Sequence, residues 1–400
     1  MKNNLKIGVL IPEFPGQTHS FFWREIQALQ RHHGHETRII STRLPPQKVQ
    51  HEWVAEAQAT YLYPTPPAAL APAAGVVLTA LPRLLAQKDA RALLKTPKNA
   101  ALLLMAAYLL RLCRKEGIGH LHVHSCANAA LIAALCRRMG GPPYSLVLHG
   151  PLGDYGPYQP FKWQRAAFAF VITEKLRQEM LEEIPQAAEK MHVVPMGVDT
   201  DRFAPGPVPV PPAPPFLWFS CARLNRIKGF ETLLDALAAL REARPDLPCH
   251  VTIAGEDESG GSGYRKVLEA RIDALDLAAH VTLLGAVTQA EVLTQLHRCH
   301  GFVLASLHEP LGVAYMEAMA CALPVIGTDA GGVRELITHE KDGLLVPATN
   351  APALTQAMVR VMEDAALRSG LGRQARARIE KDFGARRSAD ALAGVLTQRR

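Results

Sequence analysis

The chain of 400 residues has little uninterrupted apolar sequence. Its longest apolar run, residues 100–110, falls short of the roughly 18–20 residues that a spanning helix needs. The N-terminal residues pass directly into a strand pattern, without the features of a signal peptide. Apolar residues make up 48% of the chain and the mean hydropathy is +0.02. We therefore expect a soluble cytoplasmic protein without a transmembrane segment.

Several metal and cofactor motifs are also missing. The seven cysteines are scattered and form no C-x-x-C pair, which favours reduced thiols and argues against a zinc site. The loop at residues 13–20 follows the first strand but has no G-x-G-x-x-G, which argues against a dehydrogenase. No D-x-D motif follows a strand, so we expect that the chemistry requires no metal and no cofactor.

Acidic residues are too few in the first half to balance its basic residues. Residues 1–203 hold 23 Lys and Arg against 15 Asp and Glu, whereas residues 204–400 hold 21 against 22. The segment 83–115 alone has eight basic residues among leucines and alanines. Such a segment is typical of basic helices on an anionic membrane surface, or of a solvated helix face over an ordinary core. Nucleic acid is not expected as a partner, because no reading motif accompanies the charge.

Short apolar strands alternate with helical patterns along most of the chain, which predicts an α/β fold with doubly wound parallel sheets. The pattern is interrupted by the proline-dense stretch at 204–215, which we interpret as a stiff linker. Two Rossmann-like domains follow from this division, 1–203 and 216–382. Ligands of such sheets bind beyond the carboxyl ends of the strands, so two facing domains predict a central cleft.

Loops that follow strands in the second half carry polar and flexible residues suited to a nucleotide diphosphate. Arg223 and Lys228 place two cations before a predicted helix. The Arg223 guanidinium can donate two hydrogen bonds to a phosphate, and the Lys228 ammonium supplies a point charge. Gly331 and Gly332 permit close approach of a backbone to an anion at another helix N-terminus.

Two glutamates, Glu309 and Glu317, follow the predicted strand at 301–306. Pro310 suits the first position of a helix, and Gly312 leaves the backbone open for a phosphate. Glu309 then precedes the helix and Glu317 lies inside it. Because a carboxylate accepts two hydroxyl hydrogen bonds, the pair suits a molecule with a sugar at each end and phosphates between.

These motifs, in this order and spacing, resemble the retaining glycosyltransferases with the GT-B fold known as glycosyltransferase family four. The resemblance covers nearly the whole second half and is specific because several motifs occur together. The matching segments are residues 196–203, 222–229, 254–255, 309–320, 324–335 and 343–347.

The resemblance implies roles for individual residues. Glu309 contacts hydroxyls of the donor sugar, Glu317 holds the ribose, and Arg223 and Lys228 neutralise the diphosphate. His149, after a strand of the first half, lies close to the transferred sugar. The resemblance also places backbone groups of the following residues at the donor: Gly16, Pro310, Leu311, Gly312 and Val313.

The first loop departs from the commoner family pattern. A single glycine, Gly16, stands where the family usually has a glycine-rich turn, and this version is similar to bacterial exopolysaccharide and colanic-acid-type glycosyltransferases. His19, Ser20 and His124 are candidates for the acceptor side or the phosphate side, although a histidine beside aromatic residues is also typical of a packed position.

The resemblance predicts a hexosyltransferase that moves a sugar from a nucleotide-diphosphate sugar to a hydroxyl of a glycan or polyprenyl-linked acceptor, with retention, in exopolysaccharide biosynthesis. We expect a cytoplasmic enzyme, peripheral on the inner face of the membrane through residues 83–115. The final helix, within 383–400, matches the family helix that crosses back to the first domain. A nucleotide-sugar epimerase of the same fold and a non-catalytic nucleotide-sugar-binding subunit remain the alternatives.

Overall fold

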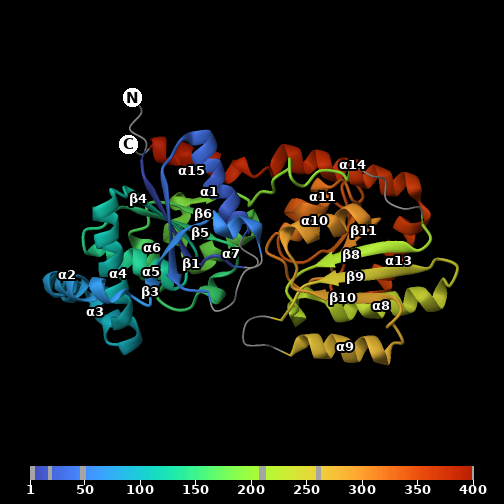
Figure 1. The fold of residues 1–400 in the computed structure, drawn as a ribbon, viewed down its shortest axis with the longest axis horizontal. Helices are drawn as coiled ribbons and strands as arrows, with labels where there is room; N and C mark the ends of the chain where they lie inside the picture. The colour runs from blue at the N-terminus through green and yellow to red at the C-terminus, as the bar shows by residue number, and fades with distance from the viewer. Residues whose placement is uncertain (1–4, 17–19, 46–50, 207–212, 258–262, 399–400) are drawn as a thin grey trace. The chain divides into compact units, whose positions relative to one another are not determined.

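The chain folds into two compact α/β units, seen in a computed structural model that describes residues 5–16, 20–45, 51–206, 213–257 and 263–398 (Figure 1). Unit 1 comprises Met1–Pro195 and Ser388–Arg400, and unit 2 comprises Met196–Arg387. The division falls after Pro195, ahead of the boundary after residue 203 that the sequence predicted. Backbone hydrogen bonds explain the difference, because Val198 donates to Phe383 and accepts from Ala385, each at 2.9 Å, within unit 2. The predicted linker lies partly outside the described residues, at 207–212.

Unit 1 is built on a parallel sheet with the strand order β3-β2-β1-β4-β5-β6-β7 in its described residues. The strands are β1 (Ile7–Glu13), β2 (Thr37–Arg43), β3 (Ala59–Tyr63), β4 (His120–His124), β5 (Tyr144–Leu148), β6 (Ala169–Val171) and β7 (Met191–Val193). The order reverses direction between β1 and β4, which is the topological switch point where doubly wound sheets bind ligands.

The helices of unit 1 connect these strands. They are α1 (Ser20–His33), α2 (Pro67–Ala86), α3 (Lys88–Leu94), α4 (Pro97–Glu116), α5 (Asn128–Arg138), α6 (Gln159–Gln164), α7 (Glu174–Glu183) and α15 (Arg386–Gln398). The last helix completes the core, because Ala389, Leu392 and Leu396 pack in the same buried cluster as Ile7 and Ile26.

Unit 2 repeats the same topology, with the strand order β10-β9-β8-β11-β12-β13 and parallel pairing among the described strands. The strands are β8 (Phe216–Cys221), β9 (Cys249–Ala254), β10 (Val281–Gly285), β11 (Gly301–Val303), β12 (Val325–Thr328) and β13 (Leu344–Val346). The helices are α8 (Phe230–Ala243), α9 (Tyr264–Ala274), α10 (Gln289–Arg298), α11 (Val313–Ala320), α12 (Val333–Leu336), α13 (Ala351–Glu363) and α14 (Ala365–Asp382). Its switch point therefore lies between β8 and β11.

Helix α2 is the main element that the sequence did not predict. It has 20 residues with a mean hydropathy of 1.6 in its most apolar window. Only 11% of that window is buried, so most of this apolar helix is accessible. By length and composition it meets the criterion for a spanning helix, contrary to the expectation drawn from the longest apolar run. In Figure 1 it lies beside α3 and α4 at the edge of unit 1, away from the sheet.

Candidate active site

Two loops of unit 2 meet at its switch point and bring an acid and a base together. The loop after β8 carries Lys228, and the loop after β11 carries Glu309. The Lys228 Nζ lies 2.5 Å from the Glu309 Oε2, with 14% and 10% of the two side chains exposed. The Ser306 hydroxyl donates to the same carboxylate oxygen at 3.3 Å. The arrangement is a largely buried ion pair at the position where this topology binds ligands.

Backbone contacts hold the two loops against each other. The Leu307 N–H donates to the Ile227 carbonyl at 2.7 Å. Gly229, with φ +65°, packs so tightly on the next loop that a Cβ would lie 1.8 Å from the Ala305 carbonyl oxygen. A residue with a side chain is excluded there, because it would clash and would also be strained at this φ. The position of Lys228 relative to Glu309 is therefore fixed by main chain on both sides.

The helix after Glu309 begins later than the sequence predicted. Pro310 is not its first residue, because α11 begins at Val313 and Gly312 is the N-cap with φ +101°. A left-handed residue ends the extended backbone there, so the helix starts after the glycine rather than at the proline. Leu311 is buried. Glu309 still precedes the helix, and Glu317 lies within it, as expected.

Glu317 lies near two thiols, those of Cys221 at the carboxyl end of β8 and of the buried Cys321 at the end of α11. Burial and then the Glu317 charge raise the pKa of Cys221 to about 12. Burial, followed by the same charge, also raises the pKa of Cys321 to about 12. Counted over the whole residue, Glu317 and Glu309 are each 8% exposed. Both glutamates are thus held at the edge of the core rather than on an open helix face.

Gly331 and Gly332 contact the backbone of Glu309, whereas the sequence analysis assigned them to an anion. The Gly332 N–H donates to the Glu309 carbonyl at 2.9 Å, so it supports the loop instead of facing an anion. A Cβ on Gly331 would lie 2.1 Å from the same oxygen. Arg334, two residues further on, forms an ion pair with Asp329. The Gly331–Gly332 turn therefore supports the loop that carries Glu309.

Arg223 is exposed in the loop after β8. The neighbouring Leu224 N–H donates to the Glu256 carbonyl at 3.0 Å, which ties this loop to the one after β9. Asp199 has a structural role, because its Oδ1 accepts hydrogen bonds from the backbone N–H groups of Asp201 and Arg202.

In unit 1 the predicted histidines cluster at the carboxyl ends of β4 and β5. The rings of His124 and His149 stack with centroids 5.7 Å apart, and His124 Nδ1 lies 3.5 Å from His149 Nε2. Phe21 and Phe22 of α1 pack edge-on against His149. The His149 N–H donates to the Tyr155 hydroxyl at 2.8 Å. These contacts hold the half-buried His149 ring from one side.

The other first-half candidates are less defined. Gly16 is buried after β1, and Ser20 is the first residue of α1. His19 lies outside the described residues.

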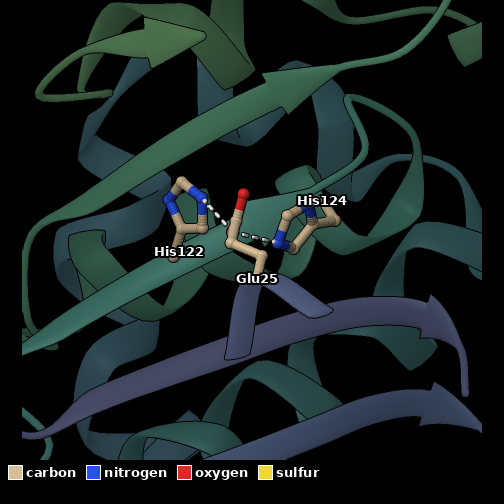
Figure 2. Close-up of side chains that lie close together, drawn as sticks. All are labelled: Glu25, His122 and His124. Carbon is tan, nitrogen blue, oxygen red and sulfur yellow. Dashed lines mark ion pairs between the residues drawn. The ribbon is translucent and has the colours of Figure 1, made fainter. Parts of the chain in front are cut away.

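Two residues that the sequence analysis did not single out complete the histidine cluster. Glu25 of α1 and His122 of β4 are 7% and 0% exposed. The Glu25 Oε1 lies 3.3 Å from His122 Nε2 and 3.1 Å from His124 Nε2 (Figure 2). A signal was available: an acid on the apolar stripe of a helix, together with His-x-His on a strand whose alternate side chains share one face.

The protonation of this cluster is shaped by its burial. Burial raises the pKa of the Glu25 carboxyl, but the two imidazoles more than offset it, so the pKa lies well below its usual range. Burial lowers the pKa of His122 despite the neighbouring carboxylate. Glu25 is therefore ionised, and His122 favours its neutral form.

The two halves of the chain match two families of sugar-transferring enzymes. Residues 20–202 match the family described as Glycosyltransferase Family 4, and residues 208–378 match the family described as Glycosyl transferases group 1.

Two relatives of about 30% identity align with little more than half of the chain. WcaL of Escherichia coli, a putative colanic acid biosynthesis glycosyltransferase, is 31% identical over 239 residues, or 58% of this chain and 57% of WcaL. A D-inositol 3-phosphate glycosyltransferase of Pseudarthrobacter chlorophenolicus is 30% identical over 237 residues, or 57% of this chain and 55% of the relative. The matched region thus spans somewhat more than half the length of these relatives.

Solved structures share the fold over nearly the whole chain. A glycosyltransferase of Rickettsia africae has a TM-score of 0.75 at 17% identity and covers 99% of this chain and 98% of its own. Alr3699/HepE of Anabaena, solved with UDP-glucose, has a TM-score of 0.75 at 17% identity, with 99% and 100% covered. Both halves of the chain therefore carry glycosyltransferase domains on a GT-B fold, and the chain belongs to the glycosyltransferases that these two family matches describe.

Proposed function

We propose that the chain is a retaining hexosyltransferase that uses a nucleotide-diphosphate sugar. The observation that carries this proposal is the buried Lys228–Glu309 pair at the switch point of unit 2, with Glu317 held nearby in α11. A cation for phosphate and two carboxylates for hydroxyl groups are the groups that a donor with a sugar at each end requires. The acceptor is a hydroxyl of a glycan or of a polyprenyl-linked oligosaccharide, and the process is exopolysaccharide biosynthesis.

The donor takes over part of an existing ion pair. Before it binds, Lys228 neutralises Glu309. A diphosphate at this loop gives Lys228 a second anion, and the Glu309 oxygens then accept hydrogen bonds from hydroxyls of the donor sugar. Since Lys228 is held by its loop before the donor arrives, little reorganisation is needed when phosphate charge develops.

Transfer then proceeds on one face of the sugar. The bond between the anomeric carbon and the β-phosphate oxygen breaks, and its electron pair stays on the phosphate, where Lys228 and Arg223 stabilise the charge. The acceptor oxygen forms the new bond to the anomeric carbon, and its proton passes to the departing phosphate. His149 is the unit 1 residue that we assign to the transferred sugar. No step of this sequence requires a metal.

A thermal-shift screen with UDP-, GDP- and ADP-sugars tests donor binding. One donor class should raise the melting temperature of the wild type by about 5 °C at saturating concentration. Glu317→Ala should lose this ligand-induced shift relative to its own ligand-free value. Glu242→Ala, which changes an exposed glutamate on α8, is the matched control and should keep the shift. No shift of the wild type with any donor would contradict the proposal, and an NMR spectrum of the product with inverted anomeric configuration would contradict retention.

We further propose that unit 1 associates with the cytoplasmic face of a membrane through α2 and α3. Leu78 of α2 is 71% exposed. Basic side chains that follow it are exposed as well, namely Arg83, Lys88, Arg91 and Lys95. The acid among them, Asp89, is already paired with Arg138 at 2.8 Å, so it does little to offset these charges. An exposed apolar helix beside exposed cations suits the interface of an anionic bilayer.

Co-sedimentation with vesicles tests this surface. The wild type should pellet with phosphatidylglycerol-containing vesicles and remain in the supernatant with phosphatidylcholine alone. Leu78→Asp should weaken pelleting several-fold, whereas Leu44→Asp, at another exposed leucine of unit 1, should not. Equal recovery of the wild type in the supernatant with both vesicles would exclude the membrane surface.

A further inference from the structure

Three side chains of unit 1 direct one ligand atom each toward a common point. They are Glu25 from α1 and His122 and His124 from β4 (Figure 2). One carboxylate oxygen and one ring nitrogen from each histidine all lie within 4.8 Å of one another. The two histidines alternate along one strand, so they face the same side of the sheet, and α1 brings the glutamate over them.

The contacts among these atoms are close, but they are not ordinary hydrogen bonds. Glu25 Oε1 lies 3.3 Å and 3.1 Å from the two Nε2 atoms. Within the described part of the chain, none of the three atoms makes a hydrogen bond of normal geometry, although all three are buried. Ligands of a tetrahedral Zn²⁺ at bond lengths of about 2.0–2.1 Å are separated by roughly 3.3 Å. The two spacings between the carboxylate oxygen and the imidazole nitrogens therefore match those between atoms that surround an ion.

The other ring nitrogens are arranged as supporting groups. His122 Nδ1 lies 2.8 Å from the Ser145 hydroxyl, and the same hydroxyl lies 2.8 Å from His120 Nε2. If His122 binds through Nε2, its Nδ1–H donates to Ser145, whose own proton is then donated to His120. Metal-bound imidazoles are usually oriented through the second nitrogen in this way.

We propose that Glu25, His122 and His124 bind a divalent transition-metal ion, with Zn²⁺ as the best match. Two neutral imidazoles and one carboxylate form a ligand set suited to this ion, and a water molecule or the second carboxylate oxygen completes a tetrahedron. The burial of the three side chains indicates that the ion enters as the chain folds. The site is distinct from the donor loops, which lie in unit 2.

The ion also has a consequence for His149, which rests on the proposed function. Binding through Nε2 leaves the proton of His124 on Nδ1, 3.5 Å from His149 Nε2. His149 then accepts at Nε2 and carries its own proton on Nδ1. The three ligands are thus positioning residues for His149 and do not contact the donor themselves.

Metal analysis of the untagged full-length protein tests the site. The chain is expressed in medium supplemented with Zn²⁺ or Co²⁺, dialysed against metal-free buffer, and measured by inductively coupled plasma mass spectrometry. We expect about one ion per chain, and for the Co²⁺ form an absorption band of a four-coordinate ion in the visible range. Glu25→Gln and His124→Gln should each reduce retained metal at least ten-fold. His192→Gln changes a partly buried histidine of β7, outside this cluster, and should retain the ion.

Several outcomes would overturn the proposal. A folded wild type that retains less than a tenth of an equivalent, and shows no Co²⁺ band, has no such site. Equal retention by wild type and ligand variants would assign the metal to surface histidines. The donor-induced thermal shift is measured on the same samples. A protein without metal that keeps this shift would contradict the metal site alone and leave the proposed donor binding intact.

Discussion

The two switch points of this molecule share a topology but differ in chemistry. In unit 2, Lys228 and Glu309 form an ion pair that keeps part of each side chain exposed. In unit 1, the corresponding region holds Glu25 of α1 and His122 and His124 of β4 in a nearly inaccessible cluster beside aromatic rings. The strand order determines where polar side chains gather, and the residues in the loops determine whether they face a ligand or one another.

The two units also differ in the partner that each gives to a lysine. Lys228 meets a carboxylate, whereas the Lys162 ammonium of unit 1, 2% exposed, donates to the Tyr155 carbonyl at 2.9 Å. Burial lowers the pKa of Lys162 to about 8. One unit therefore pairs its lysine with an acid, and the other holds a lysine whose pKa is lowered by burial.

The largest effect is expected from removing the cation of unit 2. Lys228→Ala should lower kcat of sugar transfer about 10³-fold, because a preorganised charge at the departing phosphate is lost. Lys266→Ala, on the exposed face of α9, should leave kcat unchanged. A steady-state assay of nucleotide release with acceptor measures both. Near-normal turnover of Lys228→Ala would remove the ion pair from the mechanism.

A smaller loss is expected on the histidine side. His149→Ala should lower kcat about 10²-fold, within the range of a single positioned polar group, and should leave the donor-induced thermal shift intact. The paired readouts divide the two units: Glu317→Ala in unit 2 loses the shift, and His149→Ala in unit 1 keeps it. Loss of the donor-induced shift in His149→Ala would contradict the assignment of donor binding to unit 2 alone.

Stability should respond to the ion pair in a non-additive way. Lys228→Met leaves the Glu309 carboxylate largely buried without its cation and should destabilise unit 2 by about 2 kcal/mol, below the value for a fully buried pair because both side chains are partly exposed. The double variant Lys228→Met/Glu309→Gln should recover most of this loss without recovering activity. Urea unfolding measures the difference. A double variant as unstable as the single one would show that the lysine stabilises through packing instead.

The smallest effect concerns the pH dependence of Lys162. Its pKa is about 8 in the folded chain and near 10.5 when unfolded, so between these values the unfolded state binds more protons. Stability of the wild type relative to Lys162→Met should therefore rise with pH above about 8, by at most about 1.4 kcal/mol per pH unit. Melting temperatures at pH 7.5 and 9.5 measure this, with Lys95→Met as an exposed control. A pH-independent difference between wild type and Lys162→Met would contradict the lowered pKa.

Much of the fold was predictable because its strands are short apolar segments bounded by turns. The strand predicted at 301–306 is present as the shorter β11, and the helix that carries Glu317 follows it as predicted. Helix α2 was missed because Pro72 and Pro82 lie inside it and its exposed face is apolar, so it lacks the alternation on which helix prediction depends. β3 was missed as well, in a segment of mixed polarity.

The loops that carry the candidate residues were predictable from the sequence, but the contacts of these residues were not. Glu309 and Lys228 were identified by type and by the loops that carry them, whereas their direct pairing joins residues 81 positions apart and depends on β8 and β11 being neighbours. The helix start at Pro310 was wrong because the left-handed Gly312 overrides the preference of proline. The Gly331–Gly332 turn was assigned to an anion, but the Glu309 carbonyl takes the Gly332 N–H.

The discontinuity of unit 1 has a consequence for how the chain is made. Ala389, Leu392 and Leu396 complete a core whose other members come from the first 194 residues. During translation all of unit 2 is synthesised before these residues appear, so unit 2 can fold as soon as it leaves the ribosome. Unit 1 is begun first and finished last, and its nascent core must remain incomplete until the final helix arrives.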